Sequence, residues 1–169
     1  DHATGKRAAN KISEDDQVFE ESTVAQMTVA QSKSGFKWID IFNPKKSDIE
    51  ELARQYGLHS TSVQDTLDPE HLPQFERLST YNFLILRAYD AQAAADSDEV
   101  EELSRKIAIF YTDKFLITVH RKDQEFNAQL REKWRGECET RKTVTSSVLL
   151  SDIVKRTILT YEQPIDDAL

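Results

Sequence analysis

The segment from residue 36 to residue 87 restricts the possible folds most, because strands and helices with clear ends follow one another there. Its first part, Phe36–Phe42, carries apolar side chains on both faces of an expected strand. A strand that is apolar on both sides is typical of a sheet with both faces at least partly covered. Asn43-Pro44 ends the strand, since the residue before a proline is restricted in conformation.

Two helices are predicted after this strand. Ser47 and Glu50 have the spacing of a capping box, in which the hydroxyl accepts a first-turn N–H and the carboxylate reaches back. Gly57 is predicted to end this helix in the left-handed conformation. Ser60 is expected to cap a shorter helix over Thr61–Leu67. One face of the first helix is apolar and predicts burial there, at Ile49, Leu52, Ala53 and Tyr56.

Further strands are predicted to pair in antiparallel fashion. Residues 74–78 and 81–89 have the composition of two strands joined by a short turn. Leu103–Tyr111 and Phe115–His120 form a hairpin around a tight turn. Residues 23–31 alternate well enough for a strand at a sheet edge, whereas residues 92–102 are rich in alanine and acidic residues and indicate a loop.

The C-terminal part of the chain predicts two further helices. Asp123 is expected to cap the first, which runs from Gln124 to about Arg135 and ends at Gly136. The second begins near Val144 and is interrupted by Pro164, because a proline inside a helix removes a hydrogen bond. Its buried stripe is predicted at Leu150, Val154, Ile158, Tyr161 and Ile165.

Helices before and after a run of strands predict an α/β fold, a three-layer α/β/α sandwich with a mixed, largely antiparallel central sheet. The 169 residues suffice for one domain with a real core. Residues 1–16 are polar and aperiodic, which predicts a disordered tail before a domain over 17–169.

The composition limits the classes of partner. A net charge of −8 argues against nucleic acid, because binding to phosphates requires a basic face. The single Cys138 allows no internal disulfide. No apolar run approaches the ~20 residues of a membrane span. As given, the sequence therefore predicts a soluble chain.

Catalytic motifs are missing, so the residues by themselves do not indicate an enzyme. There is no Gly-x-Ser-x-Gly, no Walker-type loop and no His-Glu-x-x-His. His59 and His71 flank Asp65, but they lie twelve positions apart with the helix breaker Pro69 between them, which argues against a paired histidine zinc site. His120 is interpreted as a polar strand end.

Two single carboxylates remain as candidate ligands for a hard cation. Asp65 and Asp152 each lie in an expected helix, and neither makes a site alone. Mg²⁺ keeps several waters and uses one or two carboxylates, so a site shared between subunits has this sparse appearance. The alternative is that both are ordinary residues of a polar helix face.

The order and spacing of several motifs resemble the cytoplasmic domain of the CorA-type magnesium transporters. The resemblance covers roughly residues 36–165. It is carried by Trp38-Ile39-Asp40-Ile41-Phe42-Asn43-Pro44, Gly57-Leu58-His59-Ser60, Gln64-Asp65-Thr66-Leu67, Pro73-Gln74-Phe75-Glu76, Tyr81-Asn82-Phe83-Leu84-Ile85-Leu86-Arg87 and Phe115-Leu116-Ile117-Thr118-Val119-His120.

The resemblance implies a regulatory domain of a homopentameric transporter rather than an enzyme. It implies weak, regulatory binding of Mg²⁺, or of Co²⁺ or Zn²⁺, between neighbouring subunits, with Asp65 and Asp152 as ligands. It also implies a truncated helix that leads toward a stalk, and attachment to the cell (inner) membrane only through C-terminal helices that this chain lacks. The domain itself is expected on the cytoplasmic side.

This sequence departs from the family pattern at three positions. Gln64 replaces a second acidic residue, Ser60 replaces the proline of a His-Pro pair, and Leu72-Pro73-Gln74 replaces Arg-Pro-Lys. A neutral amide is a weaker Mg²⁺ ligand than a carboxylate. Two other readings stay open: the cytoplasmic domain of a zinc transporter of the ZntB type, and a free-standing α/β enzyme.

Overall fold

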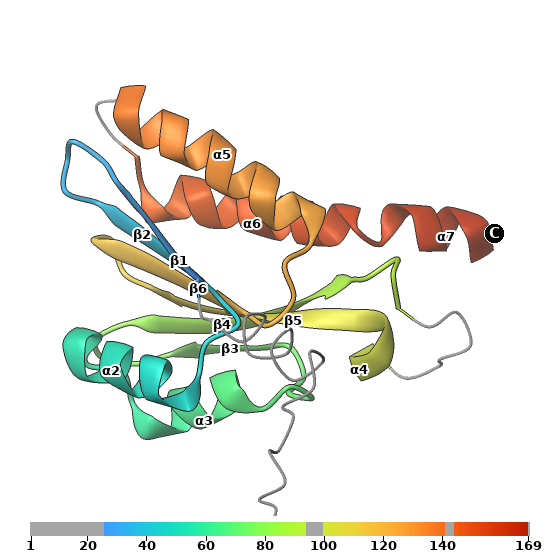
Figure 1. The fold of residues 1–169 in the computed structure, drawn as a ribbon, viewed down its shortest axis with the longest axis horizontal. Coiled ribbons are helices and arrows are strands. Elements are labelled where there is room, and N and C mark those ends of the chain that lie inside the picture. The colour runs from blue at the N-terminus through green and yellow to red at the C-terminus, as the bar shows by residue number, and fades with distance from the viewer. Residues whose placement is uncertain (1–25, 94–99, 141–143, 169) are drawn as a thin grey trace, which may run out of the picture.

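A six-stranded sheet divides the molecule into two layers of helices (Figure 1). The computed structural model describes residues 26–93, 100–140 and 144–168, so the predicted tail over 1–16 lies outside the described residues. The strand order is β1-β2-β6-β5-β4-β3. The pairing of β2 with β6 is parallel and the other four pairings are antiparallel, which confirms a mixed, largely antiparallel sheet.

The strands agree closely with their predicted positions. β2 runs over Lys37–Phe42, with both faces buried, and β1 lies beside it at the sheet edge. The predicted hairpin is confirmed as β5 and β6. The remaining bounds are Gln26–Gln31 for β1, Gln74–Arg77 for β3, Asn82–Tyr89 for β4, Ser104–Tyr111 for β5 and Phe115–His120 for β6.

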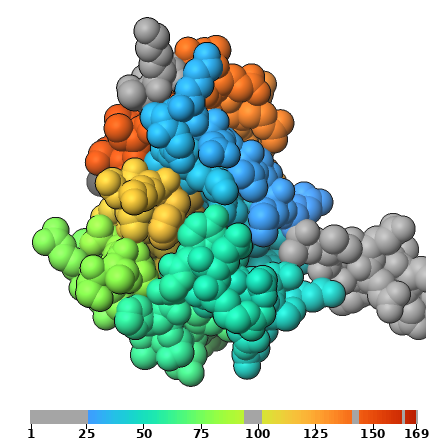
Figure 2. All heavy atoms as spheres, turned by 90° about the vertical axis from the view of Figure 1, so that its left-hand side faces the viewer, coloured from blue at the N-terminus to red at the C-terminus, as the bar shows by residue number. Residues whose placement is uncertain are grey.

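Helices cover both faces of the sheet, as the α/β/α prediction requires. α2 (Lys46–Tyr56) and α3 (Ser60–Leu67) lie on one face. α5 (Glu125–Thr140) and α6 (Ser146–Leu159) lie on the other, and α7 (Glu162–Ala168) extends from α6 beyond the sheet (Figure 1). Figure 2 shows this layering from one side, with α5 above the edge strand β1 and α2 below it.

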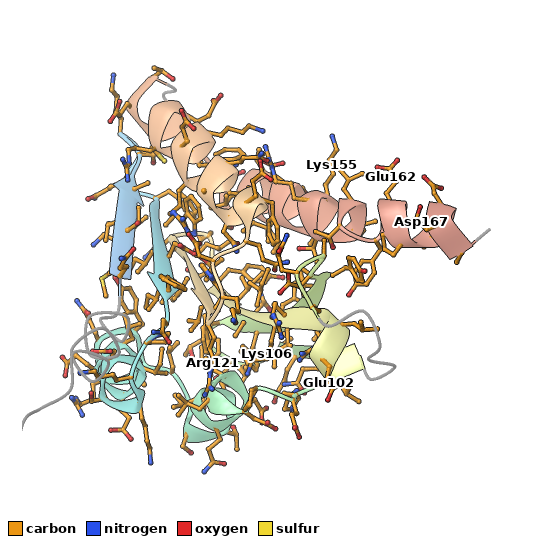
Figure 3. All side chains as sticks on the ribbon, turned by 45° about the vertical axis from the view of Figure 1, so that its right-hand side comes forward. Glu102, Lys106, Arg121, Lys155, Glu162 and Asp167 are labelled. Carbon is orange, nitrogen blue, oxygen red and sulfur yellow. The ribbon has the colours of Figure 1, made fainter. Side chains whose placement is uncertain are left out.

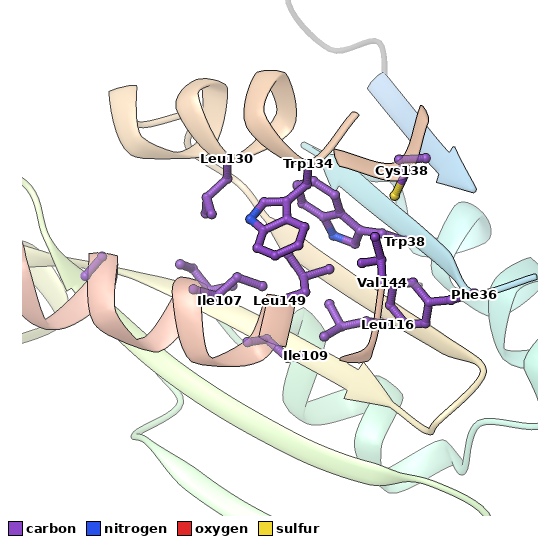
Figure 4. Close-up of a cluster of buried hydrophobic side chains, with 13 residues drawn as sticks. Phe36, Trp38, Ile107, Ile109, Leu116, Leu130, Trp134, Cys138, Val144 and Leu149 are labelled. Atoms are coloured by element: carbon purple, nitrogen blue, oxygen red, sulfur yellow. The ribbon is translucent and has the colours of Figure 1, made fainter. Parts of the chain in front are cut away.

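Each face of the sheet has its own apolar core. On the side of α5 and α6, two tryptophans, Trp38 and Trp134, pack with Leu149 and Ile153 (Figure 4). On the side of α2 and α3, stacked phenylalanine rings form the centre, and Ile49 of α2 is fully buried against them. Burial of apolar area on both faces explains why β2, β5 and β6 carry apolar residues at successive positions.

The predicted starts of the two helices on one face are wrong, by two residues for α2 and by one residue for α3. α2 begins at Lys46, and the carboxylate of Asp48 accepts the backbone N–H of Lys45 at 2.8 Å, so Ser47 lies inside the first turn. α3 begins at Ser60 itself, after His59. The end of α2 is as predicted, because Gly57 has the left-handed φ of 67°.

The C-terminal helices differ from the prediction in two ways. α5 continues through Gly136 to Thr140, because Cys138 extends the buried stripe of Leu130 and Trp134 by another turn. α6 turns a different face inward than predicted: Leu149 and Ile153 are buried, whereas Ile158 is 64% exposed. Two adjacent apolar stripes run along this sequence, and packing against α5 and the sheet selects one of them.

Pro164 interrupts the last helix as expected. The break falls at Thr160 and Tyr161, and α7 resumes with the proline in its first turn, where its missing N–H is tolerated. The predicted loop at 92–102 contains a short helix, α4 (Val100–Leu103), and residues 94–99 lie outside the described part.

A buried carboxylate joins the parallel strands β2 and β6 to α5. Asp40 is 4% exposed. Its Oδ1 accepts hydrogen bonds from Thr118 Oγ1 at 2.6 Å and from His120 Nε2 at 2.8 Å. Its Oδ2 accepts from Arg131 of α5 at 3.0 Å. His120 is therefore a partner in a buried ion pair and not a mere polar strand end.

The contacts of His120 require that both of its ring nitrogens carry a proton. Nδ1 lies 2.8 Å from the carbonyl of Lys122, which only accepts, and Nε2 faces the carboxylate of Asp40. Burial opposes the charge, but the hydrogen bond and the charge of Asp40 raise the pKa of His120. Burial likewise opposes ionisation of Asp40, yet its bonds to His120, Thr118 and Arg131 lower its pKa.

We predict that isoleucines on opposite sides of α6 contribute very differently to stability. Ile153→Ala removes a side chain that is 1% exposed, and the cavity should lower the free energy of unfolding by about 2–5 kcal/mol. Ile158→Ala is the matched control and should change it by less than about 0.5 kcal/mol. Chemical denaturation measures both, and equal losses would contradict the inward face described above.

A second prediction concerns the pairing of Asp40 with His120. Asp40→Asn leaves a buried imidazole without its counter-charge, so the pKa of His120 should fall and the protein should lose about 3–5 kcal/mol of stability at neutral pH. Titration of the His120 ring by NMR measures the pKa. Asp123→Asn serves as the control, since Asp123 lies 4.0 Å from Nδ1 of His120 and should shift its pKa less. An unchanged His120 pKa in Asp40→Asn would refute the assignment.

The pair of Asp40 and His120 also determines the direction in which the stability of the protein changes with pH. Because the pKa of His120 is raised above 6.5, its contribution to stability is fully present below that pH and is lost as pH rises through the raised value. Because the pKa of Asp40 is lowered below 3.8, its contribution is present above 3.8 and is lost as pH falls through the lowered value. The free energy of unfolding, measured over both pH ranges, should therefore depend less on pH in Asp40→Asn than in the unchanged protein.

Candidate functional site

Asp65 lies on α3 with its carboxylate held in one orientation. Its Oδ2 accepts a hydrogen bond from the side-chain amide of Gln74 at 3.1 Å. Its Oδ1 lies 3.4 Å from Nε2 of His71. The side chain is 31% exposed, so solvent reaches the carboxylate. Asp65 therefore combines access from solution with a fixed orientation, which suits a cation ligand.

The backbone that carries Asp65 is anchored by cations at the C-terminal end of α3. Lys106 Nζ donates to the carbonyls of Asp65 and Thr66 at 2.7 Å each, and also to that of Asp68. Arg121 donates to the carbonyl of Leu67 at 3.1 Å. Figure 3 shows Lys106 and Arg121 side by side at α3. These contacts satisfy carbonyls that have no partner within the helix.

A small pocket of about 160 Å³ lies behind this anchor. Arg87, Lys106 and Arg121 line it, but Arg87 and Lys106 are engaged with backbone carbonyls. Burial lowers the pKa of Lys106 to about 8. The pocket is therefore part of the attachment of α3 to the sheet.

Asp152 lies on α6 in a different electrostatic environment. Its carboxylate accepts hydrogen bonds from Lys133 at 2.9 Å, from the indole of Trp134 at 2.8 Å and from Arg156 at 3.2 Å. Burial opposes its charge, but these three donors together lower its pKa. Asp152 thus links α6 to α5, and two cations already balance its charge.

The structure does not bring the two predicted ligands together. α3 and α6 lie on opposite faces of the sheet, so Asp65 and Asp152 cannot bind one ion within a single chain (Figure 1). Within the described part of the chain, no group of three His, Cys, Asp or Glu side chains is placed to hold a metal ion. A metal ion on Asp65 would therefore need ligands other than the side chains in this described part.

Sequence reasoning missed the neighbours of Asp65. His71 follows Pro69 and Gln74 follows Pro73, and only the turn between α3 and β3 brings both side chains back to the carboxylate. His59, the other candidate near Asp65 in sequence, instead packs its ring against Tyr81 at a centroid distance of 5.6 Å. The positions of the two histidines in the sequence do not show which of them lies beside Asp65.

No helix within residues 26–93, 100–140 and 144–168 is both long and apolar enough to cross a bilayer.

Comparison with known proteins gives a consistent family. A putative metal ion transporter of Schizosaccharomyces pombe is 28% identical over 101 residues, which make up 60% of this chain and 16% of that protein. This chain therefore spans less than a fifth of the length of that relative.

Solved structures share the fold at low sequence identity. The soluble domain of CorA from Methanocaldococcus jannaschii matches with a TM-score of 0.61 and 16% identity, over 86% of this chain and 61% of that one. The cytoplasmic domain of ZntB from Vibrio parahaemolyticus matches with a TM-score of 0.62 and 18% identity, over 83% and 61%.

The family model described as "CorA-like Mg2+ transporter protein" matches residues 33–168, which is most of the chain. This family consists of transporters and not of enzymes, which removes the reading of a free-standing α/β enzyme. The chain belongs to the CorA-like Mg²⁺ transporter family.

Proposed function

We propose that this chain is the cytoplasmic regulatory domain of a CorA-like magnesium and cobalt transporter, and that it senses divalent cations. The observation that carries the proposal is the family match over residues 33–168. The fold adds support, because the similar solved structures are named as a soluble and a cytoplasmic domain. In this proposal the transporter lies in the cell (inner) membrane and is held there by helices outside this chain.

We assign the sensing of divalent cations to Asp65. A partly exposed carboxylate, oriented by Gln74, attracts a divalent cation to the surface of α3. In a homopentamer, acidic groups of a neighbouring subunit would face this carboxylate and repel it. A bound cation offsets that repulsion and bridges the subunits, and its loss lets them separate and opens the pore.

Asp152 remains a second proposed ligand, with a different requirement. Lys133 and Arg156 balance its charge, so a metal ion must displace at least one of these cations to bind. Lys133 is 44% exposed and is the easier one to displace. Binding at Asp152 should therefore be weaker than binding at Asp65.

The identity of the transported ion distinguishes the two readings within this family. Mg²⁺ or Co²⁺ is the first proposal, because the family description names Mg²⁺. Zinc is the alternative, since the cytoplasmic domain of ZntB is similar in fold. Transport of isotopically or fluorescently followed Mg²⁺, Co²⁺ and Zn²⁺ by the whole transporter separates them.

Replacing Asp65 tests the sensing role in the whole transporter. Asp65→Ala should raise the Mg²⁺ concentration that closes the pore roughly tenfold or more, because the proposed ion loses its carboxylate ligand. Ion flux measured against internal Mg²⁺ gives that concentration. Glu70→Ala is the matched control, an exposed carboxylate five residues further along that should leave it unchanged. If Asp65→Ala and Glu70→Ala behave alike, the proposed role of Asp65 is wrong.

A further inference from the structure

The pocket behind the anchor of α3 has a local charge opposite to that of the whole chain. Its volume is about 160 Å³, and five of its twelve lining residues are Lys or Arg. No Asp or Glu occurs among the described residues that line it. Leu67 and Val119 contribute apolar parts of the wall. A positively charged pocket thus lies in a chain whose net charge is −8.

Three of the basic residues gather where α3 meets the sheet. Arg87 of β4 and Lys106 of β5 are direct cross-strand partners, and Arg121 follows the end of β6 beside Lys106 (Figure 3). Burial is the main cause that lowers the pKa of Lys106 to about 8, and the charges of Arg121 and Arg87 lower it as well. The charges of Asp68 and Asp65 act in the opposite direction. The three cations are therefore close enough to repel one another.

The hydrogen bonds of these cations do not neutralise their charge. Lys106 donates to three backbone carbonyls and Arg121 donates to one, and all four acceptors are neutral groups. The C-terminal end of a helix carries about half a negative charge, which is less than the charge of two cations. Within the part of the chain that the structure describes, no carboxylate forms an ion pair with Lys106 or Arg121. The pocket therefore keeps an excess of positive charge.

Arg121 gives a ligand both access and hydrogen-bond donors. A guanidinium has five N–H groups, and the bond to the carbonyl of Leu67 occupies one of them. Arg121 and the adjacent Lys122 are exposed, so the pocket can be reached from solution. One water requires about 10–15 Å³, so the pocket has room for an oxyanion of several atoms. The planar fork of an arginine matches the oxygens of a phosphate group.

We propose that this pocket binds a phosphate group, either as inorganic phosphate or as part of a small soluble phosphate ester. Arg121 donates to the phosphate oxygens, and Lys106 and Arg87 supply positive charge at the inner end of the pocket. The apolar wall at Leu67 and Val119 suits the organic part of an ester. The site does not use the carboxylate of Asp65, so it is separate from the proposed cation sensor.

Calorimetric titration of inorganic phosphate and of phenyl phosphate into this chain tests the pocket, at neutral pH and with EDTA to remove divalent cations. Arg121→Gln should lower the affinity for both probes about tenfold or more, because hydrogen bonds between charged groups are lost. Lys155→Gln is the matched control. It removes the same charge from an exposed position on α6, on the other side of the sheet, and should change the affinity less than about twofold (Figure 3).

The two probes also distinguish the two sources of the phosphate group. Tighter binding of phenyl phosphate supports an ester whose apolar part contacts Leu67 and Val119, and equal affinities support inorganic phosphate. Circular dichroism checks that each variant is folded. If Arg121→Gln binds the probes as tightly as Lys155→Gln does, or if neither probe binds at millimolar concentrations, the inference is overturned. The proposed function is tested separately, by the Mg²⁺ dependence of pore closure in Asp65→Ala.

Discussion

The buried charge of Asp40 constrains how the two halves of this fold meet. Asp40 lies on β2, and its partners Thr118 and His120 lie on β6, about 80 positions later in the chain. A buried carboxylate without partners costs several kcal/mol, so β6 and α5 must supply the compensating groups. The parallel pairing of β2 with β6 and the position of Arg131 on α5 therefore depend on one another.

On the opposite face of the sheet, basic side chains hold a helix in place by donating hydrogen bonds to its backbone carbonyls. Lys106 on β5 and Arg121 after β6 donate to the carbonyls at the end of α3. They attach a helix of only eight residues, which would be marginal alone, to the central strands. Strand β2 thus holds α5 through Asp40, and strand β5 holds α3 through Lys106, so the candidate ligand Asp65 lies on a fixed backbone.

Asp65 and Asp152 show how environment separates two similar residues. Asp152 receives two cations and an indole N–H, so its charge already stabilises the contact between α5 and α6. The carboxylate of Asp65 contacts a neutral amide and an imidazole, and it is more exposed. The carboxylate that lacks a full counter-charge is the one suited to an added cation, which is why the proposed sensing role centres on Asp65.

The sequence by itself determined the strands and the α/β/α layering, because alternating apolar residues, Gly57 and Pro164 act locally on the backbone. It also determined the family, because the order of several motifs along the chain can be read without the structure. It also suggested Asp65 as a metal ligand, and that role stays a prediction. The inward face of α6 was not predicted, because the helix carries two apolar stripes and packing selects one of them. The continuation of α5 past Gly136 was not predicted either, because a glycine can end a helix or lie within it. Only the tertiary structure placed His120 on Asp40 and His71 on Asp65, because both contacts join segments that are brought together by chain reversal and strand pairing.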